Sequence, residues 1–186
     1  DNNLLTIGVI NVVDSLIARE VDCGCYLNAG REVGVASTKA FTSQCLVLSL
    51  ISIWFAQNHD INELKRKKMI DDLRKLPNQI EELLENQNTK EYIKYFENKK
   101  STFILGKGKS EAVAREGALK IKEISYIHAE GYSSSSLKHG PFALLEDDFP
   151  VIIINPNDKY YAKSNNAKEE ILSRNANVIV LSLIHI

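Results

Sequence analysis

Three charged side chains in the second half of the chain are spaced to share one face of a helix. Glu116, Lys120 and Glu123 stand at positions i, i+4 and i+7, which form one stripe when the segment is helical. His139 follows in the run LKHGP, residues 137–141. Carboxylate, ammonium and imidazole groups can all move protons near neutral pH once their pKa values are tuned. These residue types therefore indicate proton-transfer chemistry.

The same residues also have plain structural explanations. Glu123 and Lys120 would form a surface ion pair worth about 0.3–0.5 kcal/mol, and His139 would be a turn or helix-cap histidine. His128 lies in the strand predicted after that helix and is interpreted as structural. His59 and His185 have no supporting context. The spacing alone leaves both interpretations open.

A second candidate segment, residues 29–44 (AGREVGVASTKAFTSQ), runs into a predicted apolar helix. It contains Glu32, Val35 and Ser37. A loop that enters a helix N-terminus presents free backbone N–H groups, which suits an oxygen-rich ligand. The alternative is that Ser37 and Thr38 only cap the helix.

Both segments resemble the isomerase half of the isomerising glutamine–fructose-6-phosphate aminotransferases. The similar stretches are KEISYIHAE followed by LKHGP, AGREVGVASTKAFTSQ, and the AREVDCGC run at residues 18–25. They occur in the family's order and extend over nearly the whole chain. One departure stands out, because Ser135 and Ser136 replace the Gly-Glu pair that usually precedes LKHGP.

The resemblance implies a role for each candidate catalytic residue. Glu123 takes the position of the base that moves a proton between C1 and C2 of the sugar, converting a ketose imine to an aldose amine. Lys120 would keep Glu123 charged or assist proton transfer at the sugar oxygens. His139 would reach into the neighbouring subunit's site and help to open the sugar ring, which implies a homodimer.

The resemblance also implies the ligands. Fructose 6-phosphate and glucosamine 6-phosphate would be contacted by the backbone of Val35, with Glu32 and Ser37 close by. No metal or organic cofactor is implied. Two alternatives stay open: another sugar-isomerase (SIS) domain enzyme such as a deglycase or deaminase, and a non-catalytic module that senses sugar phosphates. The sensing module would be expected to lose Glu123 or His139.

The order of elements predicts an α/β fold. Apolar, β-branched runs indicate buried strands at residues 4–13, 23–27, 102–105, 127–130, 150–155 and 176–181, with helices at 34–57, 110–126 and 159–173. We expect three-layer, flavodoxin-like parallel sheets of the SIS type with flanking helices. The chain would comprise the rear of a first SIS subdomain (1–59), a charged helical connector (60–100) and the front of a second subdomain (101–186).

Composition excludes several classes of function. The 186 residues carry a net charge of −1, which gives no reason to expect nucleic acid or a membrane surface as a partner. Cys23, Cys25 and Cys45 have no zinc-ligand spacing and suit a reducing cytosol, so we expect a cytoplasmic protein. The apolar run at residues 45–56 is too short to span a bilayer and suits a buried helix.

Two further features complete the expectations. The GKGKS run at residues 106–110 lacks the glycines of phosphate and dinucleotide loops, and predicts a tight strand-to-helix turn. The chain opens and closes on apolar runs, so we expect a fragment of a longer protein. It would lack the glutaminase domain, the main sugar-phosphate loop and the C-terminal tail, and would be inactive as a synthase alone. Residues 182–186 match no motif of the family.

Overall fold

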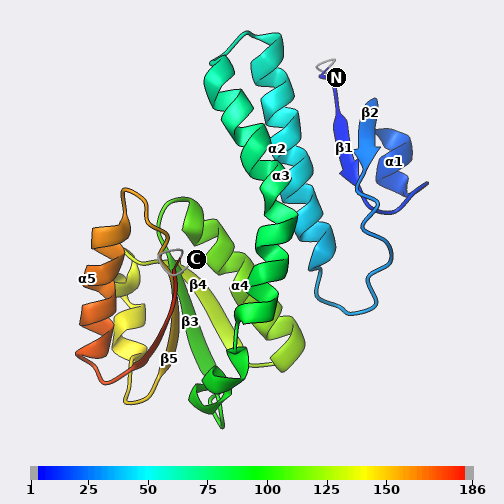
Figure 1. Ribbon diagram of the computed structural model, residues 1–186. Coiled ribbons are helices and arrows are strands. Elements are labelled where there is room, and N and C mark those ends of the chain that lie inside the picture. The colour runs from blue at the N-terminus through cyan, green and yellow to red at the C-terminus, as the bar shows by residue number, and fades with distance from the viewer. Residues whose placement is uncertain (1–3, 183–186) are drawn as a thin grey trace. The chain divides into compact units, whose positions relative to one another are not determined.

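The computed structural model describes residues 4–182. By its internal contacts the chain divides into two compact units, residues 1–86 and 87–186, shown in Figure 1. Each unit is described by itself. The predicted connector of residues 60–100 contributes its long helix to the first unit, and its role as a separate connector stays a prediction. His185 lies outside the described range, as do residues 183–186 of the segment that matches no motif of the family.

The first unit opens with a strand–helix–strand arrangement. Strands β1 (Ile7–Ile10) and β2 (Cys23–Tyr26) pair in parallel, and the short helix α1 (Leu16–Glu20) connects them along the chain. The predicted strand at 4–13 is therefore much shorter than expected. Leu4, Leu5, Val12 and Val13 at its ends are all more than half exposed. The prediction of burial fails because β1 has one strand neighbour, and because a backbone turn from Val12 to Ser15 ends it.

Two long helices complete the first unit. Helix α2 (Lys39–Asn58) and helix α3 (Glu63–Asn86) follow one another after a short turn. Among the residues the structure describes, α2 alone is long and apolar enough to cross a membrane by length and composition, with a mean hydropathy of 1.4. The core helix of a soluble protein passes the same test.

Helix α2 is much less covered than its sequence predicts. Its apolar residues surround the helix, which is typical of a helix buried on several sides, yet Ala40 and Ile53 are the residues of α2 that are buried. Trp54 and Phe55 are about half exposed. The prediction of a buried helix is wrong for this chain, since an apolar pattern cannot reveal which segment covers the helix.

Helix α3 is the charged amphipathic helix expected in this region. Lys67 pairs with Glu63 at 2.6 Å and Lys68 pairs with Asp72 at 3.0 Å, and all four side chains are exposed. Lys67 and Lys68 thus lie on a solvated face of the helix. Pro77 lies inside α3, and a short 3₁₀ helix, η1 (Thr89–Tyr95), begins the second unit.

The second unit contains a four-stranded parallel sheet. Its strands are β3 (Ser101–Gly106), β4 (His128–Ser133), β5 (Pro150–Ile154) and β6 (Asn177–Leu181), in the order β4-β3-β5-β6. Helix α4 (Lys109–Ser125) joins β3 to β4, and α5 (Tyr161–Leu172) joins β5 to β6. Two 3₁₀ turns, η2 (Leu137–His139) and η3 (Pro141–Leu144), lie between β4 and β5. This arrangement confirms the predicted α/β class.

Side chains from alternate positions of β3 build a core on each face of the sheet. Phe103 and Leu105 pack with Leu137 of η2 and Ile171 of α5. Ile104 instead packs with the buried alanines of α4. Helices therefore cover both faces, in the three layers that the sequence predicts, with α4 and α5 on opposite sides of the sheet (Figure 1).

Glycines hold α4 close to the sheet. Gly108, with φ of 61°, forms the turn into α4, which confirms the predicted strand-to-helix turn. A Cβ atom on Gly131 of β4 would lie 2.5 Å from the Arg115 Cα of α4. No side chain could separate these backbones without moving the helix, so Gly131 sets the position of α4 on the sheet.

Candidate functional site

Helix α4 carries the charged cluster that the spacing predicts. Ala114 and Ala118 lie on the face of α4 that is buried against the sheet. The charged residues lie on another face of the helix, away from this core. On that face Lys120 Nζ lies 2.8 Å from Glu123 Oε2 and 3.3 Å from Glu116 Oε1. All three side chains are only 20–26% exposed. The cluster of Glu116, Lys120 and Glu123, called the α4 cluster below, is therefore partly shielded from water.

Lys120 serves the α4 cluster as a fixed cation. Its hydrogen bond to Glu123, and then the hydrogen bond and charge of Glu116, raise the pKa of the Lys120 ammonium above its ordinary value of 10.5. Lys120 thus stays protonated at neutral pH, and it contributes an attraction that would be lost only as the pH rises beyond that value. It is suited to hold a carboxylate or a sugar oxygen, and unsuited to act as a nucleophilic amine.

Glu123 keeps one carboxylate oxygen available. Oε2 accepts from Lys120, whereas no hydrogen bond or ion pair within residues 4–182 involves Oε1. An oriented carboxylate with one unoccupied oxygen, beside a fixed ammonium, can accept a proton from a bound molecule and return it. The local geometry therefore allows the role of base.

His139 lies on the other side of the sheet from the α4 cluster. Leu137, two residues before it in η2, is fully buried in the core that faces α5, and α4 packs on the opposite face. The imidazole is exposed and makes no hydrogen bond to any described residue. Within one chain the structure does not bring His139 to Glu123.

The loop before His139 is held without the usual glutamate. The Ser136 N–H donates to Ser133 O at 2.8 Å, and the His139 N–H donates to Ser136 O at 3.0 Å. The Lys107 ammonium donates to the Ser135 hydroxyl. Backbone hydrogen bonds therefore order this turn, so the replacement of Gly-Glu by Ser135-Ser136 leaves the turn folded.

The residues of the second predicted segment meet at the start of α2. The Glu32 carboxylate accepts from the Ser37 hydroxyl at 3.1 Å, the Thr38 N–H at 2.8 Å and the Ala40 N–H at 3.1 Å. Val35, in the same loop, is 87% exposed. Two of the N–H groups that the sequence offers to a ligand are thus already occupied by Glu32. Thr38 is the N-cap residue but makes no side-chain cap bond.

The six predicted site residues thus form three local groups. Lys120 contacts Glu123 in the second unit. Glu32 contacts Ser37 in the first unit, with Val35 exposed in the loop between them. His139 stands apart over the other sheet face. Sequence reasoning missed the capping role of Glu32, whereas the contact of Glu116 with Lys120 follows from their i, i+4 spacing. Within residues 4–182, no group of three or more His, Cys, Asp or Glu side chains could hold a metal ion.

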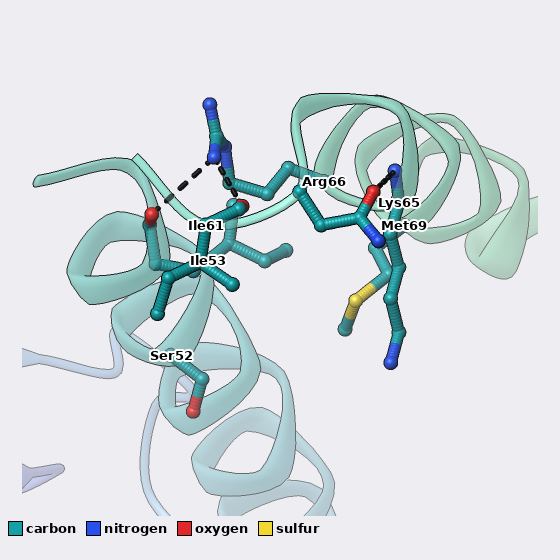
Figure 2. A pocket seen from close by; sticks show the side chains of 8 residues that line it. Ser52, Ile53, Ile61, Lys65, Arg66 and Met69 are labelled. Atoms are coloured by element: carbon teal, nitrogen blue, oxygen red, sulfur yellow. Dashed lines mark hydrogen bonds between the residues drawn. The ribbon is translucent and has the colours of Figure 1, made fainter. Parts of the chain in front are cut away.

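A small cavity of about 180 Å³ lies at the turn between α2 and α3 and contains none of these six residues. Figure 2 shows its lining, which includes Ile53, Ile61 and Met69. Arg66 also lines it and donates to the carbonyl oxygens of Ala56, at 3.3 Å, and Ile61. Its side chain is 14% exposed. Arg66 therefore satisfies carbonyl groups at the end of α2 and ties the two helices together.

We expect Arg66→Ala to destabilise the first unit by about 1.5–3 kcal/mol, the usual value of hydrogen bonds to a charged group. Urea unfolding monitored by Trp54 fluorescence would measure the loss. Arg74→Ala is the matched control, since Arg74 is 78% exposed and lies 3.8 Å from Asp71, and its loss should be near zero. Equal midpoints for the two variants would contradict the role of Arg66.

Comparisons with known proteins agree with this fold. The SIS domain family matches residues 95–183. Glutamine–fructose-6-phosphate aminotransferase [isomerizing] from Chlorobaculum tepidum is 43% identical over 98% of this chain and 30% of its own length. The Homo sapiens form 2 is 40% identical over 97% of this chain and 27% of its own length. This chain thus spans less than a third of the length of these relatives.

Solved structures give the same result. The C-terminal domain of glucosamine-fructose-6-phosphate aminotransferase from Francisella tularensis superposes with a TM-score of 0.90 at 36% identity, over 95% of this chain and 50% of that domain. A glucosamine-6-phosphate deaminase from Thermotoga maritima, with a TM-score of 0.70 at 22% identity over 95% of this chain and 52% of its own, shares the fold alone. From these matches, the chain belongs to the family of isomerising glutamine–fructose-6-phosphate aminotransferases and carries part of its isomerase region.

Proposed function

We propose that the whole protein converts fructose 6-phosphate and glutamine to glucosamine 6-phosphate and glutamate, and that the α4 cluster serves its sugar isomerisation. The observation that carries this proposal is the partly buried Lys120–Glu123 pair at 2.8 Å, with one Glu123 oxygen unoccupied. The family membership supplies the reaction class. We place the protein in the cytoplasm, as the free cysteines also favour.

The proposed chemistry needs one base that takes a proton from C1 of a ketose imine and returns it to C2. Glu123 supplies that base, because a carboxylate can act on both carbons from one face of the sugar. Lys120 stays an ammonium beside it, which holds the carboxylate in place through their hydrogen bond and can stabilise negative charge on a sugar oxygen. No step in this scheme calls for a metal or an organic cofactor.

His139 acts, in this proposal, on a sugar bound in the other subunit of a homodimer. The separation of His139 and Glu123 by the sheet supports this arrangement. An imidazole can both donate and accept a proton, so it can protonate the ring oxygen of the sugar and deprotonate the hydroxyl that becomes the carbonyl. Fructose 6-phosphate would be contacted by the exposed loop that carries Val35, with Glu32 and Ser37 close to it.

A subunit-mixing experiment tests the shared site. We expect full-length Glu123→Gln and His139→Gln proteins to be nearly inactive alone, and their co-expressed mixture to recover about a quarter of wild-type activity. Half of the dimers formed at random are mixed, and each mixed dimer has one of its two sites intact. In the control, two copies of the same variant are co-expressed, and the activity should stay as low as that of the variant alone. No recovery in a mixture proven to contain mixed dimers would show that both residues serve one subunit's own site.

The function itself is tested with the full-length protein and both substrates. We expect glucosamine 6-phosphate to form from fructose 6-phosphate and glutamine. Isomerisation of fructose 6-phosphate without nitrogen transfer would instead indicate a different SIS-domain isomerase. Tight binding of the sugar phosphate with no turnover would indicate a sensing module.

A further inference from the structure

Asn155 carries a buried polar atom that the chain leaves without a partner. Asn155 follows directly after β5 and is 2% exposed. Its Nδ2 donates to Asn165 Oδ1 of α5 at 2.9 Å, whereas its Oδ1 accepts no hydrogen bond from any residue in the range 4–182. Buried acceptors are nearly always paired, and an exception calls for a group that the chain does not supply. The free oxygen therefore points to a bound molecule with a hydrogen-bond donor.

The sheet register places Asn155 beside Lys107. Leu105 of β3 pairs with Ile153 of β5, and both side chains pack in the core that faces α5. Two residues further along each strand, Lys107 comes opposite Asn155, and alternation keeps both side chains on that same face. The bond from Asn155 to Asn165 of α5 agrees with this placement. A molecule that reaches the free oxygen would thus lie close to an ammonium group.

Two helices begin side by side at the same edge of the sheet. Gly108 is the N-cap of α4 and Tyr160 is the N-cap of α5. These residues touch, because a Cβ atom on Gly108 would lie 2.5 Å from Cε2 of the Tyr160 ring. Gly108 has no side chain to cap α4, and Tyr160 makes no side-chain cap bond to α5. The partial positive charges of two helix ends therefore meet at one place, which favours an anion.

The strand order marks this place as well. β3 and β5 are neighbours in the sheet, yet β3 leads to α4 on one face and β5 leads to α5 on the other (Figure 1). In open parallel sheets, ligands bind outside the carboxyl ends of neighbouring strands whose connections leave toward opposite faces. The free oxygen, the helix ends and the topology therefore indicate one site.

Four lysines stand in or beside the first turns of the two helices, and none forms an ion pair with a residue in the range 4–182. They are Lys107, Lys109, Lys159 and Lys163. Lys107 donates to the Ser135 hydroxyl. The ammonium groups of Lys107 and Lys159 lie 5.8 Å and 4.9 Å from the centre of the Tyr160 ring. Cations from two loops thus converge on the touching N-caps.

The acids near the helix ends do not neutralise these lysines. Glu111, in the first turn of α4, pairs with Arg115 at 2.8 Å. Asp158 accepts the N–H of Tyr160 at 2.8 Å through Oδ1. The lysines outnumber these two acids, so the edge keeps a net positive charge that suits a phosphate group.

We propose that this edge, built from Lys107, Asn155 and the starts of α4 and α5, binds a small phosphate monoester that carries a hydroxyl group. The phosphate lies against the helix N-termini and the lysines, and the hydroxyl donates to Asn155 Oδ1. The site contains none of the six candidate residues discussed above, and it does not depend on the proposed function. It is called the α4–α5 edge site below.

Hydrogen exchange in the full-length protein tests whether the α4–α5 edge site exists. Glycerol 3-phosphate is the probe, and the peptides 105–112 and 156–166 report on the site. At ten times its half-saturating concentration the probe should slow exchange in both peptides about tenfold. Lys107→Ala should bind the probe about tenfold more weakly, because it loses a charge-assisted contact. Lys90→Ala, at an exposed lysine of η1, is the matched control and should bind like wild type.

Unchanged exchange in both wild-type peptides, up to the solubility limit of the probe, would overturn the proposal. Slowing that survives in Lys107→Ala at the wild-type affinity would do so too, since the effect would then arise from binding elsewhere.

A second probe tests the role of Asn155. Methyl phosphate has the same charge as glycerol 3-phosphate but carries no hydroxyl on carbon. Wild type should bind glycerol 3-phosphate about fivefold more tightly than methyl phosphate, the usual effect of one hydrogen bond. Asn155→Leu should bind the two probes equally. A preference that persists in Asn155→Leu would overturn the role of Asn155. If that variant does not fold, the wild-type comparison decides, because equal binding of the two probes would exclude the hydroxyl contact.

Discussion

Replacing Glu123 by glutamine should lower kcat for glucosamine 6-phosphate formation by about 10²–10⁴-fold in the full-length protein, the usual contribution of a general base. Glutamine has the same shape but cannot take up a proton. The Lys120 ammonium can still donate to the amide oxygen, so the α4 cluster should remain folded. The loss should therefore appear in kcat with little change in the thermal midpoint.

Two measurements make this prediction specific. Steady-state kinetics with saturating glutamine give kcat and KM for fructose 6-phosphate separately. Glu169→Gln makes the same chemical change on α5, where the carboxylate is 69% exposed and pairs with Lys168, and it should leave kcat unchanged. Wild-type kcat in Glu123→Gln would remove Glu123 from the mechanism.

Replacing Gly131 by alanine should strongly destabilise the second unit. The new Cβ would meet Arg115 Cα at 2.5 Å, Arg115 N at 2.6 Å and the Ala114 carbonyl carbon at 2.8 Å. These are backbone atoms that no side-chain rotation can move. Overpacking of this kind costs about 3 kcal/mol or more when the backbone must shift, against a total stability of about 5–15 kcal/mol.

Gly117→Ala is the matched control on the helix that Gly131 contacts. Its Cβ would meet only Ile104 Cδ1, at 3.4 Å, and alanine favours a helix interior by about 0.5–1 kcal/mol over glycine. Urea unfolding should therefore show Gly117→Ala at or above wild type and Gly131→Ala far below it. A Gly131→Ala protein within about 1 kcal/mol of wild type would contradict the close packing of α4 on β4.

The elements of the second unit could be predicted from the sequence because each depends on local signals. Continuous apolar runs mark β3, β5 and β6, and the central strands β3 and β5 are covered on both faces, as is typical of a parallel sheet. The contacts of Lys120 likewise follow from spacing, since residues three and four apart on a helix are neighbours. Glycine at position 106 and at position 108 was enough to indicate the turn between β3 and α4.

Contacts that depend on the path of a loop could not be predicted in this way. The bonds from Glu32 to Thr38 and Ala40 span six and eight residues of irregular backbone, for which no periodic pattern exists. The exposure of α2 was missed because an apolar surface predicts that something covers the helix. It does not say which segment does so, or whether that segment belongs to the first unit. The separation of His139 from Glu123 depends on which face of the sheet η2 and α4 each pack against, and neither motif contains that information.

The most direct test of the catalytic assignment is a crystal structure of the full-length protein with glucosamine 6-phosphate bound. The account predicts a Glu123 carboxylate oxygen about 3–3.5 Å from C1 or C2 of the sugar, the distance that proton transfer requires, with Lys120 beside it. A sugar whose C1 and C2 lie beyond about 6 Å from Glu123, outside the reach of any hydrogen bond, would contradict it.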